Sequence, residues 1–239
     1  MNRKTDAGAD RKAVLTRLSA RERLLAAADE LFYENGINLV GIDRVIEHAG
    51  VAKASLYDSF GSKEELIRCY LQARSERRQG RIRERMAQCQ SPRDKILSVF
   101  DLLGETVAEP NYRGCAFQRA GAEAGAGSSV KGTCDASRAW IRREFTELAR
   151  AAGARDPESL GRQLVLLYDG AAATAHMDRD LEAPQAARAL AERLLSSQVS
   201  KPAVAKIPPR TYRRLIPPAP PGSRTAVDEK SKREILEEE

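Results

Sequence analysis

The sequence predicts an all-α protein with about nine helices. Apolar residues recur at intervals of three and four residues in successive segments, which places them on one face of an α-helix. Capping residues precede or follow most of these segments, and no segment of strand length alternates apolar and polar side chains. With 42% hydrophobic and 31% charged residues among 239, the composition is that of an ordinary soluble globular chain.

The first helix is predicted to begin after Ser19, because Ser19 and Glu22 have the spacing of a capping box. Residues 1–18 are polar and show no apolar period, and we expect a flexible, solubilising arm there; a basic arm can also follow DNA. The pair Asn35-Gly36 ends the helix. Its apolar stripe consists of Leu24, Leu25, Ala28, Leu31 and Phe32.

Two short helices are predicted next, at residues 42–49 and 53–60. Gly50 ends the first of them, because glycine takes the left-handed conformation at little cost. The turn at residues 50–52 leads directly into the second. A fourth, longer helix is predicted from Ser62, which has the spacing of a second capping box with Glu65, to about Gln88.

Five further helices are predicted between residues 91 and 197. Two of them begin with a proline at the first helical position, which a capping residue precedes. In order, the five cover residues 92–107, residues around 115–124, a segment about Trp140 that ends near Gly153, residues 157–177 and residues 184–197.

The first four helices have the size and spacing of a helix-turn-helix unit, in which the second short helix enters the major groove of DNA. Residues 49–66 read A-G-V-x-K-x-x-L-Y-x-x-F-x-S-K-E-x-L. Together with residues 24–36, this segment closely resembles the DNA-binding domain of the TetR family of bacterial repressors. The resemblance implies a homodimer on a palindromic operator in double-stranded DNA, with a divergent ligand-binding domain and repression that ends when a small molecule binds.

We therefore expect four parts in the chain. They are the flexible arm at 1–18, a helix-turn-helix DNA-binding domain at 19–68, a helical ligand-binding and dimerisation domain at 69–200, and a Pro-rich, charged and disordered tail at 201–239. The family dimerises through its last two long helices, which correspond to the segments near 157–178 and 184–197. Two amphipathic helices of this kind can form a four-helix interface with a partner.

The resemblance also carries over individual DNA contacts. Lys53 and Lys63 lie where the family contacts phosphates, at helix N-termini that add backbone N–H groups. Tyr57 matches the family tyrosine whose hydroxyl reaches the DNA backbone. The recognition-helix side chains that we expect to face base edges are Ala54, Ser55 and Asp58.

Two positions depart from the family pattern. Gly41 stands where the family commonly has a Thr or Ser that caps the second helix and touches DNA, and glycine offers no hydroxyl. Asp58 stands where the family often has a histidine. Phosphates repel a carboxylate in the groove unless a base donor or an arginine such as Arg44 neutralises it, and a solvated or locally paired Asp58 is an equally good interpretation.

The inducer of the family occupies a cavity inside the second domain. Aromatic and flexible side chains are common in such cavities, and the hydrophobic composition favours an apolar or aromatic inducer. Because aromatic residues at helical spacing also build cores, both interpretations stay open for each candidate. The candidates are Phe100, Phe117, Trp140, Phe145, Tyr168, His176 and Met177.

The sequence disfavours two other functional classes. An enzyme is disfavoured because the sequence has two histidines and no recognisable catalytic motif; without a phosphate loop, a dinucleotide fingerprint or a cluster of metal ligands, we expect no cofactor and no metal. An architectural DNA-binding protein without ligand control is disfavoured by the length of the second domain.

The chain lacks a charge-free segment long enough for a bilayer and the apolar core of a signal peptide. We therefore expect a cytoplasmic, nucleoid-associated protein with no membrane contact. The four cysteines have no CxxC spacing and are expected to be thiols. Redox activity of Cys115, close to Arg113, stays an open alternative to an inert thiol.

Overall fold

The computed structural model describes residues 18–199, and this part of the chain forms nine α-helices and no strand, which confirms the predicted fold class. The predicted arm, apart from Leu18, and the predicted tail lie outside the described residues. The helices are α2 (Ala20–Asn35), α3 (Ile42–Ala49), α4 (Lys53–Phe60), α5 (Lys63–Ala87), α6 (Pro92–Val107), α7 (Ala116–Glu123), α8 (Ser129–Ala151), α9 (Pro157–Met177) and α10 (Ala183–Val199).

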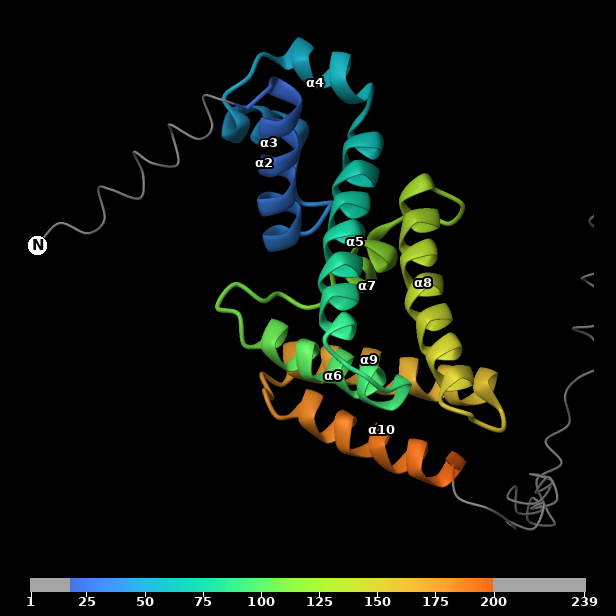
Figure 1. The fold of residues 1–239 in the computed structure, drawn as a ribbon. Helices are drawn as coiled ribbons and strands as arrows, with labels where there is room; N and C mark the ends of the chain where they lie inside the picture. The colour runs from blue at the N-terminus through green and yellow to red at the C-terminus, as the bar shows by residue number, and fades with distance from the viewer. Residues whose placement is uncertain (1–17, 200–239) are drawn as a thin grey trace, which may run out of the picture. The chain divides into compact units, whose positions relative to one another are not determined.

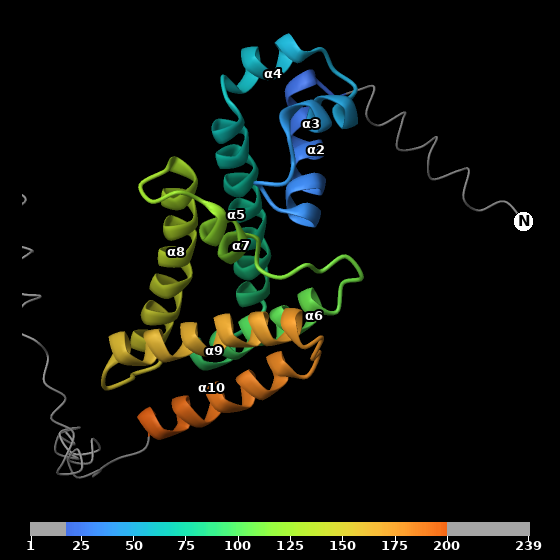
Figure 2. The ribbon, with the colours of Figure 1, turned by 180° about the vertical axis from the view of Figure 1, so that it is seen from behind.

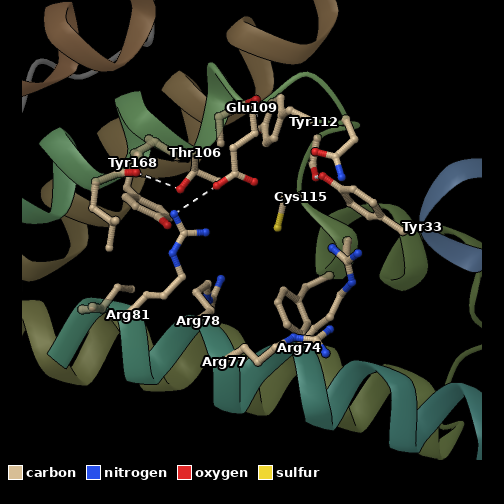
Figure 3. Close-up of a pocket in the computed structure, with 18 of the residues that line it drawn as sticks. Tyr33, Arg74, Arg77, Arg78, Arg81, Thr106, Glu109, Tyr112, Cys115 and Tyr168 are labelled. Atoms are coloured by element: carbon tan, nitrogen blue, oxygen red, sulfur yellow. Dashed lines mark hydrogen bonds and ion pairs between the residues drawn. The ribbon is translucent and has the colours of Figure 1, made fainter. Parts of the chain in front are cut away.

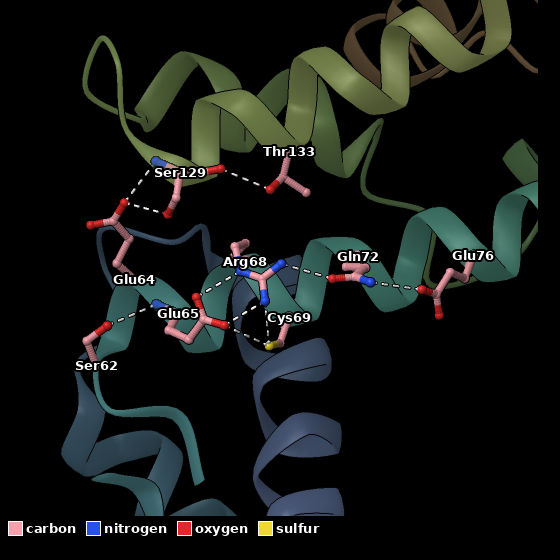
Figure 4. Close-up of polar contacts among 9 residues, drawn as sticks. All are labelled: Ser62, Glu64, Glu65, Arg68, Cys69, Gln72, Glu76, Ser129 and Thr133. Carbon is pink, nitrogen blue, oxygen red and sulfur yellow. Dashed lines mark hydrogen bonds and ion pairs between the residues drawn. The ribbon is translucent and has the colours of Figure 1, made fainter.

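The predicted capping box at the start of α2 is present. Ser19 Oγ accepts a hydrogen bond from the Glu22 N–H at 3.2 Å, and Glu22 Oε2 accepts one from the Ser19 N–H at 2.8 Å. The capping box predicted at the start of α5 is only half formed. Ser62 Oγ accepts from the Glu65 N–H at 3.1 Å, but the Glu65 carboxylate turns to Arg68, one helical turn further on (Figure 4).

The start of α8 is the boundary that the sequence pattern did not locate. The helix begins at Ser129, where the Ser128 hydroxyl accepts a hydrogen bond from the Lys131 N–H. At the other end of the chain, α10 begins at Ala183, one residue before the predicted Pro184. Both differences concern helix ends, which single-sequence patterns define to within a few residues.

The described helices bury two hydrophobic clusters, one toward each end of α5. Helices α2–α4 gather at the N-terminal end of α5, and α6, α9 and α10 lie at its C-terminal end (Figure 1). Figure 2 shows the same arrangement from behind, with α7 and α8 beside α5. The first cluster includes Leu24, Leu56 and Leu66, and it extends into α7 and the start of α8 through Phe117 and Val130. The DNA-binding helices therefore share a core with two helices of the second domain.

The second cluster joins the C-terminal half of α5 to α6, α8, α9 and α10. Its largest fully buried side chains include Phe100, Phe145 and Leu164. Since α5 supplies residues to both clusters, it crosses the domain boundary predicted at residue 68, which stays a prediction. No helix within residues 18–199 combines the length and apolar character that crossing a bilayer would require.

Candidate DNA interface and ligand cavity

Helices α3 and α4 form the predicted two-helix unit. Gly50 adopts the left-handed conformation (φ 61°, ψ 45°) and its N–H closes α3 by donating to the Glu47 and Ile46 carbonyl oxygens. On α4, Leu56 and Phe60 are buried in the first cluster. The opposite face is open to solvent, and Tyr57 is 45% exposed on it. One face of α4 is therefore packed in the first cluster, and its other face is accessible to a partner.

Lys53, at the first position of α4, forms an ion pair with Asp43 of α3. Nζ lies 3.1 Å from Asp43 Oδ1, and the two side chains are 62% and 85% exposed. This hydrogen bond and the charge of Asp43 raise the pKa of Lys53 above its ordinary value, because both stabilise the charged lysine. Asp43 was not predicted as a site residue, because the pair forms only when the turn brings together residues ten positions apart.

Most of the other predicted DNA-contacting residues of α3 and α4 are open to solvent. Gly41 is the N-cap of α3; it makes no side-chain hydrogen bond, and a Cβ there would meet no atom within 4 Å. Arg44, Ala54 and Asp58 are exposed, and Ser55 is half-buried. Among the described residues, Asp58 forms no ion pair with Arg44.

Lys63 opens α5 directly after its cap and is half-buried. The neighbouring Glu64 turns toward α8, where Oε1 accepts hydrogen bonds from the Ser129 N–H at 3.0 Å and from Ser129 Oγ at 2.6 Å (Figure 4). These bonds lower the pKa of Glu64, and the carboxylate also lies at the positive end of α8. The predicted phosphate site at Lys63 is thus tied to a helix of the second domain.

A cavity of about 300 Å³ lies between α5, α6, α9 and the segment that precedes α7. Four arginines of α5 line it at helical positions i, i+3, i+4 and i+7, so they project from one face of the helix (Figure 3). They are Arg74, Arg77, Arg78 and Arg81. Glu109, Tyr112 and Cys115 face them from the other side (Figure 3).

Three of these arginines are held by carboxylates of the chain. Arg74 Nε and Arg77 Nη2 each donate to Asp29 Oδ1 of α2 at 2.7 Å. Arg81 pairs with Glu109 at 3.0 Å. Arg74 also lies over the ring of Tyr33, 3.6 Å from its centroid. The cavity wall is therefore bonded directly to the first helix of the DNA-binding unit.

Tyr33 provides a second connection between this helix and the cavity. Its hydroxyl donates to the Gly114 carbonyl oxygen at 3.1 Å and accepts from the Arg113 N–H at 2.9 Å. Gly114 has φ 83°, and a Cβ there would lie 2.8 Å from the His176 ring. Glycine is thus required both by the backbone conformation and by the close approach of His176.

Two of the seven predicted ligand-binding residues, Phe117 and Tyr168, line this cavity. Phe100 and Phe145 instead stack on each other in the second cluster, with ring centroids 5.8 Å apart. The remaining three do not line it either: Trp140 is buried in the same cluster, His176 packs edge-on against Tyr112, and Met177 is 78% exposed. Large aromatic side chains fill a core as readily as they line a cavity.

The arginines were missed by sequence reasoning although their spacing is visible in the sequence. Charged residues at this spacing on a helix are normally solvated, so the pattern alone does not indicate a cavity.

Two tyrosines of the cavity wall keep their hydroxyls protonated, because burial raises the pKa of Tyr168 and of Tyr112. The Tyr112 hydroxyl donates to the Ala172 carbonyl oxygen at 3.0 Å.

Within residues 18–199, no group of three or more His, Cys, Asp and Glu side chains is arranged to hold a metal ion. The four cysteines are free thiols. Cys115 is half-buried on the cavity wall. Cys134 is buried, and its burial raises its pKa to about 11, which is typical of an unreactive thiol.

Comparison with known proteins matches the described fold and the helix-turn-helix unit. The family model for bacterial regulatory proteins of the tetR family matches residues 24–68. A TetR-family transcriptional regulator from Streptomyces coelicolor is 32% identical, with a TM-score of 0.72, over 76% of this chain and 96% of that one. A putative TetR transcriptional regulator from Streptomyces avermitilis is 31% identical, with a TM-score of 0.68, over 76% and 98%.

A shorter match involves the HTH-type transcriptional activator FasR of Mycolicibacterium smegmatis. It is 41% identical over 70 residues, which is 29% of this chain and about a third (32%) of that protein's length. The two Streptomyces regulators, by contrast, are matched over nearly their whole length. The chain therefore belongs to the TetR family, a family of regulators and not of enzymes, and it is a DNA-binding transcriptional regulator.

Proposed function

We propose that the protein is a homodimeric repressor at the bacterial chromosome that binds a palindromic operator and is released by a small-molecule inducer. The observation that carries the proposal is the exposed face of α4, where Tyr57 and Lys53 stand clear of the core that holds the helix. A helix presented in this way fits the major groove. The described part of the chain also contains a cavity, and Arg74, which lines it, is hydrogen-bonded to Asp29 of the DNA-binding unit.

On DNA, Lys63 and Tyr57 would contact phosphates, and Ala54, Ser55 and Asp58 would face base edges. Lys53 would exchange its partner Asp43 for a phosphate. Arg44 would support the same docking from α3. Gly41 has no hydroxyl to contact DNA, although the open space beside it would accommodate the side chain of a serine or threonine.

The proposed dimer uses the outer faces of α9 and α10. Leu166 of α9 is 67% exposed, Met177 at the end of α9 is 78% exposed, and Leu190 of α10 is also exposed. Apolar side chains this exposed on adjacent helices are typical of an interface. The isologous contact of two such pairs would form a four-helix interface. Leu166→Glu should then give monomers in sedimentation experiments, while Leu39→Glu, at an even more exposed leucine (83%) of the DNA-binding unit, should not.

The inducer would act through the contacts between the cavity and α2. Asp29 and Tyr33 belong to α2, and both bind residues that line the cavity. A ligand that prefers one arrangement of these contacts would shift the relative orientation of the domains, because only differential affinity shifts an equilibrium. By linkage, operator DNA must then weaken ligand binding by the factor with which the ligand weakens DNA binding.

The direct test is selection of binding sites from random duplex DNA with the purified protein. An enriched palindrome is expected. Tyr57→Phe and Lys63→Ala should weaken binding to all selected sites, and Lys63→Ala should reduce the salt dependence of binding. Lys95→Ala, on α6 at the far end of α5, is the matched control. No enriched site, or equal effects of the two lysine changes, would contradict the proposal.

A reporter gene behind the selected site then separates repression from activation. Loss of the protein should raise expression if it is a repressor. Lower expression would make it an activator, which is the role named for the relative FasR. The DNA contacts proposed above do not depend on this outcome.

A further inference from the structure

One arginine of the cavity wall differs from the other three in its partners. Arg74 and Arg77 share the Asp29 carboxylate, and Arg81 has Glu109. Arg78 forms no ion pair with any described residue. The nearby carboxylate of Asp169 is paired with Arg138 of α8, at 2.9 Å. Arg78 therefore brings to the cavity a positive charge without an ion-pair partner among the described residues. The Asp169 carboxylate lies near enough to feel this charge, which opposes the rise that burial causes in the pKa of Asp169.

The hydrogen bonds of Arg78 leave part of its guanidinium unused. Nη2 donates to the carbonyl oxygen of Ser137 at 3.0 Å and to its Oγ at 2.8 Å. Nε is buried without a partner, and Nη1 has none among the described residues although it is not buried. Nη1 of this half-buried guanidinium can therefore donate to an anion, whereas the buried Nε is out of reach of a ligand.

The surroundings of Arg78 suit an apolar body next to the anionic group. The guanidinium carbon lies 4.7 Å from the centroid of the Phe117 ring. Tyr168, Ile82 and Leu103 line the same cavity. A volume of about 300 Å³ is at the lower end for ligand cavities. The space fits a molecule of one or two rings and not a long chain.

We propose that this cavity binds a small organic carboxylate, with its carboxylate on Arg78 and its apolar body against Phe117 and Tyr168. This inference rests on the proposed function, since it names the chemical class of the inducer. It keeps the aromatic character expected from the composition and adds a negative charge. Nη1, which has no partner among the described residues, can donate to a carboxylate oxygen, and the charge of the guanidinium strengthens this hydrogen bond.

The test compares acids with neutral amides of the same shape. The probes are phenylacetate and indole-3-acetate, each against its primary amide, titrated calorimetrically into the full-length protein at fixed salt. Fragments of this size that fit their site bind at about 1 mM or tighter. Each acid should bind at least about tenfold more tightly than its amide, as expected for a charge-assisted hydrogen bond that the amide cannot form.

Two variants of α5 test whether Arg78 causes the preference for the acid. Arg78→Met keeps the length of the side chain and should abolish the preference for the acid. Arg83→Met removes an exposed arginine of the same helix that does not line the cavity, and it should leave the preference unchanged. Because Arg78 also ties α5 to α8, thermal unfolding shows whether the first variant is folded. If it is not, Arg78→Lys, which keeps the charge, should retain a preference that salt weakens.

Three results would overturn the inference: equal binding of acids and amides, no binding of any probe at about 5 mM, or a preference that survives Arg78→Met. Operator binding, measured on the same samples, separates this inference from the proposed function. Specific DNA binding without a preference for acids would refute the ligand class alone. A preference for acids without specific DNA binding would refute the regulatory role and leave the ligand class standing.

Discussion

Replacing Asp43 by asparagine removes the carboxylate that holds Lys53, and we expect the variant to bind operator DNA more tightly at low salt. In the free protein the lysine Nζ lies 3.1 Å from Asp43 Oδ1. Its charge is therefore balanced within the chain before DNA arrives. Asparagine keeps the size of the side chain and leaves the lysine available to a phosphate.

The size of the effect follows from the number of phosphates that are neutralised. Each lysine on a phosphate of duplex DNA contributes about 0.9 to the slope of log affinity against log salt. The proposed dimer has two such lysines, so the slope should steepen by up to about 1.8. Between 50 mM and 200 mM salt, the variant should lose about tenfold more affinity than the wild type.

The assay is fluorescence anisotropy with a labelled operator at four salt concentrations. A cycle with Lys53→Met provides the internal control, because Asp43→Asn should no longer alter the slope once the lysine is absent. Asp58→Asn removes another exposed carboxylate, from α4, and leaves the Asp43–Lys53 pair intact. Asp58→Asn should change the affinity for DNA by the same factor whether or not Lys53 is present.

Two results would refute the reasoning. If Asp43→Asn leaves the slope unchanged, Asp43 does not compete with a phosphate for Lys53. If it has the same effect with and without Lys53, only the general field of the carboxylate matters and the ion pair has no role. Chemical unfolding of each variant excludes a loss of structure, since Asp43 also lies in the first turn of α3.

Three other predictions concern contacts between helices. Gly161→Ala should lower the free energy of unfolding by about 1–2 kcal/mol, because the added Cβ would lie 3.1 Å from the backbone of Thr146. Gly80→Ala, which has open space around the added Cβ, should instead raise the free energy of unfolding by up to about 1 kcal/mol. Equal effects of the two changes in urea titrations would contradict this prediction. Asp29→Asn should cost about 2 kcal/mol in the same assay, because it breaks contacts with two arginines that link α2 to α5, and Glu147→Gln, at an exposed pair, should cost far less. The hydrogen bonds from Ser129 lower the pKa of Glu64, so its contribution to stability is present above the unfolded pKa of about 4.5 and is lost as the pH falls through the folded pKa. The difference in the free energy of unfolding between wild type and Glu64→Gln should therefore narrow below pH 4.5. A constant difference down to pH 3 would show that the contact is absent.

The helices were predictable because their signals are local. Ser19 with Glu22, Gly50 at the end of α3 and Asp156 before Pro157 all act on neighbouring residues, and each does so in the structure. The second capping box failed in part because Arg68, three residues after Glu65, competes for the same carboxylate. Local patterns therefore predict where a helix starts but not which of two nearby partners a side chain chooses.

The cavity was not predictable in the same way. Phe100 and Phe145 have the residue type and spacing of lining residues, but they face each other in the core. Asp29 and Arg74 are 45 residues apart, and their contact exists only after α2 has packed on α5. The sequence contains the arginines at regular spacing, yet only the tertiary structure shows that this face of α5 borders a cavity.

The unbroken length of α5 has a mechanical consequence. This helix of 25 residues carries Lys63 in its first turn and Arg78 fifteen residues later, a span of about 22 Å along its axis. A tilt of about 5° at the arginine would displace the lysine end by about 2 Å, and two such ends in a symmetric pair would shift by twice that amount. Half-sites recur about 34 Å apart along B-DNA, so this change in spacing would pull both contacts out of register. A lever of this kind would convert a small movement inside the protein into the release of DNA.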